Sequence, residues 1–182
     1  FPVGPVALLD EVGIDVAAHV SNDLGKAFAS RGAAPSETFT KLFDAGYRGR
    51  KNGKGFYLYP KDRAPGAPKE VNPEVYPFFG GARRKEVPAE DLVDRLALLM
   101  VNEAVWCLAE GIIDSPRDGD AGAILGLGLP PFRGGPFRYV DSVGAEGIVE
   151  RMEELAEARG RRFAPAPTLV AMARAGKRFY GS

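Results

Sequence analysis

Two side chains of this 182-residue chain belong to types that commonly carry catalysis, and each type occurs once. His19 could act as a general base or activate a nucleophile. Its acidic sequence neighbours are Asp15 and Asp23, and no matched nucleophile accompanies them. Cys107 follows Trp106 in an apolar stretch, where cysteines are usually inert packing residues. The sequence therefore favours structural roles for both residues, and an unrelated enzyme built on either one is kept only as an alternative.

An acidic cluster and a basic loop could each bind a charged ligand. Asp114, Asp118 and Asp120 could suggest calcium, but their spacing lacks the alternating oxygen ligands and the closing glutamate of an EF-hand loop. Helix capping by Asp118 or Asp120 explains them better. Residues 48–55 form a basic, glycine-rich loop that could cradle a phosphate or an anionic cofactor tail. The loop lacks Walker spacing and no strand leads into it, so a surface hairpin remains an equal alternative.

The composition excludes several classes of partner. Lysine and arginine together number 24, as do aspartate and glutamate, so the net charge is zero and no basic field attracts a nucleic acid or an anionic membrane. One cysteine and one histidine exclude an internal disulfide and a multi-histidine metal site, and we expect a reducing, intracellular compartment. No apolar run is long enough to span a membrane. The chain begins without methionine, so we expect it to be a piece of a longer protein.

Helical periodicity accounts for nearly all of the hydrophobic pattern. Apolar residues recur every three or four positions over 92–112, 14–28 and 148–156, which is typical of amphipathic helices. Shorter helices are expected over 6–12, 36–45, 121–129, 137–143 and 169–175. Only residues 55–59 have the pattern of an extended stretch. The predicted fold class is all-α.

The chain also repeats itself. At a constant offset of 131 positions, the motif Gly4, Pro5, Asp10, Gly13 recurs as Gly135, Pro136, Asp141, Gly144. Further matches follow at an offset of 130, and the two copies end on Phe56-Tyr57 and Phe179-Tyr180. The first copy has about seven extra residues before this ending, and they form the basic loop. So long an ordered series predicts a duplicated helical unit.

The repeat divides the chain into three parts. Residues 1–59 are the second half of helical repeat one, 60–88 are a proline-rich linker, and 89–182 are a complete repeat two. Residues 89–130 precede the second Gly-Pro motif, whereas the first copy begins almost at its own motif. We therefore expect the natural protein to extend on the N-terminal side by at least half a repeat. The groove left open by the absent half predicts self-association of the fragment.

Several motifs, in this order, resemble the C-terminal helical domains of 3-hydroxyacyl-CoA dehydrogenases, as found in tandem in the alpha subunits of fatty-acid oxidation complexes (trifunctional enzymes). The motifs are FPVGP at 1–5, LDEVGIDV at 9–16, GRKNGKGFY at 49–57, VNEA at 101–104 and GLGLPP with GGPF across 126–137. The resemblance covers nearly the whole chain except the linker. It implies a tandem all-α fold whose first repeat is truncated.

The resemblance also implies a reaction, the NAD-dependent oxidation of a 3-hydroxyacyl-CoA to a 3-ketoacyl-CoA. In this family a histidine base, oriented by a glutamate, belongs to an N-terminal dinucleotide-binding domain that lies outside this sequence. The family also uses an asparagine in an Asn-Arg-Leu motif. The second repeat has Asp94-Arg95-Leu96 at that place, which predicts that it is a structural duplicate in the position of a partner subunit in simpler dimeric dehydrogenases.

No catalytic, NAD-binding or metal-binding residue of the family can be assigned here. Gly4 and Pro5 align with a motif near the acyl end of the pocket, so they are predicted to form part of the substrate wall, and residues 48–55 are the other candidate contact. We expect NAD to bind the full-length protein but not this fragment, which should be inactive alone. A thiolase beta subunit is a candidate partner, and the compartment would be the bacterial cytoplasm or, in a eukaryote, the mitochondrion. The alternative is a freestanding helical dimerisation or protein-interaction module without catalysis.

Overall fold

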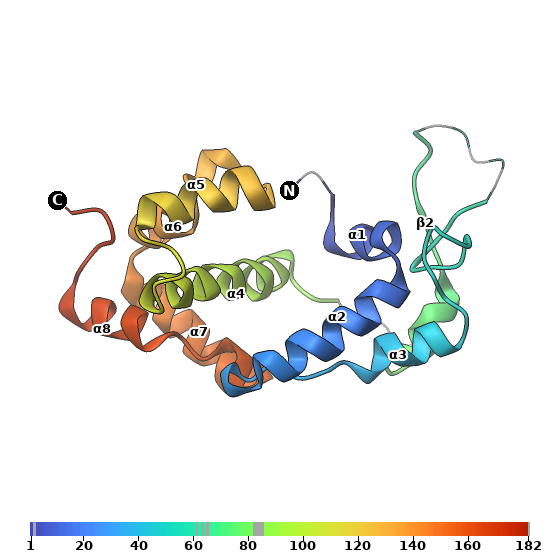
Figure 1. The fold of residues 1–182 in the computed structure, drawn as a ribbon, viewed down its shortest axis with the longest axis horizontal. Coiled ribbons are helices and arrows are strands. Elements are labelled where there is room, and N and C mark those ends of the chain that lie inside the picture. The colour runs from blue at the N-terminus through green and yellow to red at the C-terminus, as the bar shows by residue number, and fades with distance from the viewer. Residues whose placement is uncertain (2, 61, 63, 65, 82–85, 182) are drawn as a thin grey trace. The chain divides into compact units, whose positions relative to one another are not determined.

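The computed structural model describes residues 1, 3–60, 62, 64, 66–81 and 86–181 (Figure 1). The chain divides into two compact units, an N-terminal unit from Pro2 to Glu86 and a C-terminal unit from Val87 to Ser182, to which Phe1 is also assigned. Helices dominate both units, which confirms the all-α prediction. Within the described residues, no helix is both long and apolar enough to cross a membrane.

The N-terminal unit begins with four consecutive helical segments: α1 (Pro5–Val12), α2 (Ile14–Ala27), η1 (Ala29–Arg31) and α3 (Glu37–Asp44). Proline at the first position of α1 favours a helix start because its missing N–H has no helical partner there. Gly13 separates α1 from α2 with a φ of 111°, a conformation that side-chain-bearing residues avoid. Ile14 and Leu42 are fully buried and form a core with Tyr47 and Val75.

Residues 60–88 contain structure that the proline-rich composition did not indicate. Strand β2 (Glu70–Val71) pairs antiparallel with β1 (Tyr57–Leu58), and η2 (Pro73–Phe79) follows it. The buried Asn72 side chain donates to the Gly55 carbonyl at 2.9 Å and accepts from the Glu74 N–H at 3.1 Å. Asn72 therefore helps to hold this segment against the rest of the N-terminal unit, and such a contact leaves no periodic signal in the sequence.

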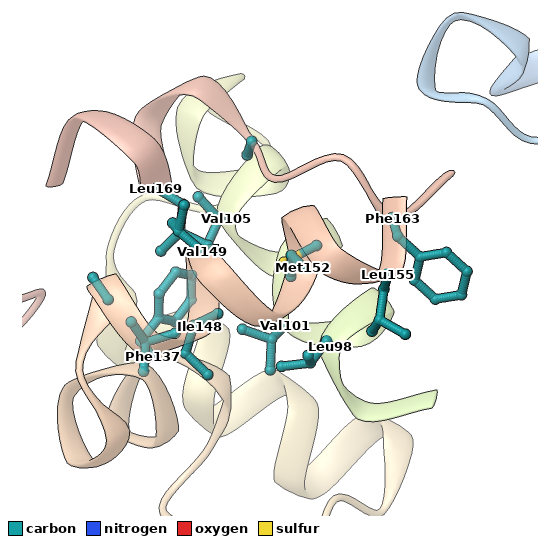
Figure 2. Close-up of a cluster of buried hydrophobic side chains, with 13 residues drawn as sticks. Leu98, Val101, Val105, Phe137, Ile148, Val149, Met152, Leu155, Phe163 and Leu169 are labelled. Carbon is teal, nitrogen blue, oxygen red and sulfur yellow. The ribbon is translucent and has the colours of Figure 1, made fainter. Parts of the chain in front are cut away.

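The C-terminal unit is wholly helical where the structure describes it. Its elements are α4 (Ala89–Ala109), α5 (Pro116–Leu127), η3 (Pro131–Arg133), α6 (Pro136–Val143), α7 (Ala145–Arg159), η4 (Arg161–Phe163) and α8 (Pro167–Ala175). Figure 2 shows its core, in which side chains from α4, α6, α7 and α8 converge. Phe137, Met152 and Leu169 have no exposed surface. Burial of this apolar surface is the main force that holds the four helices together.

Helix α5 begins five residues before the predicted start at 121, and its N-cap is neither of the two expected aspartates. Ser115 caps it by accepting the Asp118 N–H at 3.2 Å, and the Ser115 hydroxyl donates to the Asp118 carboxylate at 2.5 Å. Gly119 and Gly122 interrupt the apolar pattern in the first turns. The prediction placed the helix start too late because these glycines weaken the helical signal.

The two units share an order of elements. Helices α1, α2, η1 and α3 follow one another in the N-terminal unit as α6, α7, η4 and α8 do in the C-terminal unit. Both short first helices start with proline after a glycine, and both end at a glycine with positive φ, Gly13 at 111° and Gly144 at 97°. The elements thus recur at the offset of the sequence motifs.

Candidate functional site

Gly4 and Pro5, the predicted substrate contacts, begin α1 and are both exposed. Gly4 has an ordinary backbone conformation, with φ −67° and ψ 150°, and a Cβ atom there would meet nothing within 4 Å. Its counterpart Gly135 differs, because its φ is 109° and a Cβ would overlap the carboxylate of Asp120. Local structure therefore requires a glycine at 135, whereas the described residues give no such reason at position 4.

Asp10, on α1, is fully buried and holds the end of the first repeat. Its Oδ1 accepts the Phe56 N–H at 2.9 Å, and its Oδ2 accepts the Tyr57 N–H at 2.9 Å and the Tyr59 hydroxyl at 3.0 Å. Three donors compensate a carboxylate that burial would otherwise destabilise. Burial, together with the hydrogen bond to Asp10, raises the pKa of Tyr59 above its usual value, so the hydroxyl stays protonated as a donor.

Asp141 makes the same contact in the C-terminal unit. Its two carboxylate oxygens accept the N–H groups of Phe179 and Tyr180, each at 2.9 Å. The duplicated aspartate and the duplicated Phe-Tyr ending are therefore the two halves of one structural link. The repeat in the sequence identified both halves, but nothing in their spacing showed that they bind each other.

Asp120 has a structural role that differs from the one predicted. It is buried on α5, accepts the Phe137 N–H at 2.8 Å and receives the Tyr180 hydroxyl at 2.5 Å. It thus caps the first turn of α6 instead of its own helix. Burial raises the pKa of Tyr180 to about 12, and the Arg138 guanidinium lies 3.7 Å from the centre of the tyrosine ring. Within the described parts of the chain, no group of three or more His, Cys, Asp or Glu side chains could hold a metal ion.

The basic loop 48–55 directs its charges toward the N-terminal unit itself. Arg50 pairs with Glu11 at 2.8 Å, and Lys51 pairs with Asp15 at 2.8 Å. Lys54 lies 3.8 Å from the Glu74 carboxylate, and the Arg48 guanidinium lies 4.4 Å from the centre of the Phe43 ring. The hydrogen bond from Lys51 lowers the pKa of Asp15. All four cationic side chains of the loop are therefore engaged in contacts within the N-terminal unit. The geometry favours a structural role for the loop over phosphate binding.

The main chain of the loop is also engaged. The N–H groups of Arg48 and Gly49 donate to the Lys54 carbonyl, and the Arg50 N–H donates to the Asp10 carbonyl at 2.9 Å. The loop therefore packs on the C-terminal half of α1, whereas Gly4 and Pro5 begin that helix. At about 1.5 Å per residue, six helical residues separate the two places by about 9 Å. The structure therefore places the two candidate substrate contacts near opposite ends of the same short helix.

His19 and Cys107 belong to different units. The exposed His19 ring bonds through Nδ1 to the Asp15 carbonyl at 2.7 Å and lies edge-on to Phe43. Cys107 is partly buried on α4. Among the described residues, the ring forms no hydrogen bond to a carboxylate or to a nucleophile, so the structural interpretation of this residue fits the geometry.

Asp94 occupies the place at which the resemblance puts a functional asparagine. Its carboxylate accepts the Arg151 Nε–H at 2.7 Å, and the same guanidinium also bonds to Asp91 at 3.2 Å and Glu154 at 2.9 Å. These contacts join α4 to α7. The side chain at this position is therefore engaged in packing between helices.

One buried polar residue, Asn102, has a structural role that the sequence analysis did not predict. The Asn102 amide on α4 donates to the Ala164 carbonyl at 3.0 Å, and its oxygen accepts the Ala166 N–H at 2.8 Å. The two bonds fasten the turn before α8. An asparagine on the apolar side of a predicted helix was the available signal, because buried polar groups nearly always have partners.

Comparison with known proteins places these features in a family. The family model of the 3-hydroxyacyl-CoA dehydrogenase C-terminal domain matches residues 1–59 and 92–179. The chain is 52% identical over 180 residues to the "Fatty acid oxidation complex subunit alpha" of Shewanella amazonensis and to that of Idiomarina loihiensis. Each match covers 99% of this chain but 25% of the relative, so the chain spans about a quarter of the length of these curated relatives.

A solved structure has a similar fold. The crystal structure of the dehydrogenase part of multifunctional enzyme 1 from C. elegans matches with a TM-score of 0.60 and 24% sequence identity. The match covers 92% of this chain and 38% of that one. The family model covers most of the chain and omits residues 60–91 and 180–182. The chain therefore belongs to the family of the C-terminal domain of 3-hydroxyacyl-CoA dehydrogenase.

Proposed function

We propose that this chain is the helical C-terminal part of a multifunctional fatty-acid β-oxidation enzyme. In that protein it would support the NAD-dependent oxidation of a 3-hydroxyacyl-CoA to a 3-ketoacyl-CoA. The observation that carries the proposal is the 52% identity, over 180 residues, to proteins named fatty acid oxidation complex subunit alpha. The engagement of the chain's acidic side chains in its own packing agrees with a supporting role.

The proton and hydride chemistry belongs elsewhere in the whole protein. When bound, NAD would accept the hydride from C3 of the substrate. The described residues do not fit a dinucleotide site, because the only paired strands, β1 and β2, have two residues each and no glycine fingerprint follows a strand. We infer that this fragment alone does not oxidise the substrate.

The proposed domain organisation is a truncated first repeat followed by a linker and a complete second repeat. Side chains at equivalent positions of the two units differ in burial, and this difference supports the proposed organisation. In the C-terminal unit, Phe137 is 0% exposed and Leu155 2% exposed, in a core shared with α4. Their counterparts Val6 and Leu24 are 41% and 51% exposed. A helix equivalent to α4, supplied by a preceding segment of the whole protein, would cover them.

Gly4 and Pro5 would contribute to the wall of the substrate pocket in the whole protein. Two facts support this assignment: both residues are exposed, and the space next to Gly4 is open. A Gly4→Leu substitution in the full-length protein should then raise KM for a long-chain substrate and change kcat little, because it narrows the wall without touching the reacting atoms. An unchanged KM would argue against the assignment.

A second candidate function is a helical interaction module without catalysis. The exposed apolar residues Val16, Val20 and Leu24 on α2 favour it, since a surface of this kind tends to find a partner.

Because the relatives are named subunits of a complex and come from bacteria, we further propose that the whole protein belongs to a bacterial cytoplasmic complex. A thiolase beta subunit is the proposed partner there.

The direct test is an assay of the full-length protein with NAD and a 3-hydroxyacyl-CoA. We expect NAD reduction that requires the acyl-CoA, and we expect a purified complex to contain a thiolase. A full-length protein that forms its complex but reduces no NAD with substrates of any chain length would favour the interaction module instead.

A further inference from the structure

A small cavity lies in the C-terminal unit where α6 ends, α7 begins and α8 leads into the last residues. Its volume is about 270 Å³. It opens beside Gly144, the glycine between α6 and α7, and its wall includes Glu146 in the first turn of α7. Other lining residues are Met172, Lys177 and Arg178. None of these residues takes part in the proposed substrate wall.

The equivalent place in the N-terminal unit is filled by a lysine. Gly13 and Asp15 correspond to Gly144 and Glu146 at the offset of 131. There the Lys51 ammonium bonds to both carboxylate oxygens of Asp15, at 2.8 and 2.9 Å. A Cβ atom on Gly13 would overlap the end of the Lys51 side chain, whereas one on Gly144 would meet nothing within 4 Å. The same backbone feature is therefore occupied in one unit and open in the other.

The difference follows from the length of the loop. The first copy carries about seven more residues between its last helix and the Phe-Tyr ending, and these residues deliver Lys51. In the second copy the Arg178 guanidinium donates to the Asp141 carbonyl at 3.0 Å. This bond replaces the one that the Arg50 N–H makes to the Asp10 carbonyl. The shorter chain thus restores the structural contact of the loop but not its lysine.

We propose that the cavity beside Gly144 receives the side chain of a lysine from a partner protein, with Glu146 as its counter-ion. Glu146 is exposed and has no ion pair among the described residues. The occupied counterpart in the same chain selects an ammonium group, for which the Glu146 carboxylate supplies the opposite charge. Lys177 and Arg178 also line the cavity and oppose a further cation; Arg178 is held by its bond to the Asp141 carbonyl, so Lys177 is the wall cation whose removal should favour binding. The proposal is independent of which reaction the whole protein catalyses.

The test uses the chain's own loop as a probe. A cyclic peptide with the sequence of residues 47–57 is titrated into the isotope-labelled chain, and the amide signals of Gly144, Ala145 and Glu146 are followed by NMR. A matched peptide carries Lys51→Gln. We expect these three signals to shift with the parent peptide, and its affinity to exceed that of the matched peptide about two- to five-fold, as for one exposed ion pair.

Two variants of the chain complete the test. Glu146→Gln should weaken binding of the parent peptide by a similar factor and remove its preference for lysine, while the remaining amide signals show that the fold is intact. Lys177→Gln should leave the affinity unchanged or raise it. The proposal is overturned if no shift occurs at these amides or if both peptides bind equally. It is also overturned if inorganic phosphate produces the same shifts and Lys177→Gln abolishes them, because the cavity would then be an anion site.

Discussion

At the scale of single residues, the aspartates that bind the Phe-Tyr endings are what the two copies share most closely. Asp10 and Asp141 each accept two main-chain N–H groups from the Phe-Tyr ending of their own copy. A carboxylate can satisfy two such donors at once, which neither an amide nor a hydroxyl can do equally well. The residue type therefore follows from the number of donors that must be satisfied, and no catalytic role is needed to explain it.

Replacing Asp141 with asparagine should test this explanation. The amide would place a donor against one of the two half-buried N–H groups, so the free energy of unfolding should fall by about 0.5–1.5 kcal/mol. Urea unfolding followed by circular dichroism measures the change. Glu153→Gln, on the exposed side of α7, is the control and should stay within about 0.5 kcal/mol of the parent. Equal stability of the two variants would show that the aspartate link is dispensable.

Tyr180 should make stability depend on alkaline pH. Its pKa rises from 10.0 to about 12, chiefly through burial and next through the hydrogen bond to Asp120. A raised pKa in the folded state means that the folded chain holds the proton more tightly than the unfolded chain. The resulting stabilisation is fully present below pH 10 and is lost as the pH rises toward 12.

The matched variant is Tyr180→Phe, which lacks the titrating hydroxyl. Its free energy of unfolding should be lower than that of the parent below pH 10, by about 0.5–1.5 kcal/mol for the missing hydrogen bond. The difference between the two proteins should shrink as the pH approaches 12. Parent and variant both contain Tyr47 and Tyr59, so the effect of these two tyrosines cancels in the comparison. Parallel pH profiles for the two proteins would contradict the role of Tyr180.

At the scale of elements, the sequence predicted helices best where the hydrophobic periodicity extends over many residues. The helices over 14–27 and 89–109 follow from apolar residues at three- and four-residue steps. The start of α5 was missed because glycines break its pattern, and β2 and η2 were missed because Asn72 and nearby aromatic rings hold them by tertiary contacts. The same limit applies to the site, since the repeat marked Asp10 and Asp141 but could not show their hydrogen-bond partners.

Helix α5 should depend on its serine cap. Ser115→Ala removes the acceptor of the Asp118 N–H and the donor to its carboxylate, so the free energy of unfolding should fall by about 1 kcal/mol. Thermal unfolding measures the loss. Ser115→Thr is the matched variant and should recover most of the stability, because its hydroxyl can accept the same N–H and donate to the same carboxylate. If alanine and threonine at this position behave alike, the cap is not what fixes the start of α5.

At the scale of the whole molecule, the two units differ in how completely they bury their apolar helix faces. Leu155 of α7 is 2% exposed, whereas its counterpart Leu24 of α2 is 51% exposed. An uncovered surface of this kind favours association in water. The burial difference therefore connects the proposed truncation of the first repeat to the expected behaviour of the chain in solution.

We expect the isolated chain to self-associate through α2, and Leu24→Glu to reduce that association. A charge at this place opposes burial of the surface without disturbing the core, since Leu24 is already half exposed. Sedimentation velocity across a concentration series measures the effect, with Val143→Glu, exposed at the end of α6, as the control. A parent chain that stays monomeric at high concentration would contradict the expectation.

The central claim is that this chain supports a dehydrogenase whose proton and hydride chemistry lies outside it. The most direct measurement compares NAD reduction by the isolated 182-residue chain, the full-length protein and full-length His19→Ala, with the same 3-hydroxyacyl-CoA. We expect no reduction by the isolated chain and rates within about two-fold for the two full-length proteins, because the proposed catalytic base lies outside this chain and the exposed His19 has no carboxylate bonded to its ring among the described residues. NAD reduction by the isolated chain, or its abolition by His19→Ala, would contradict the claim.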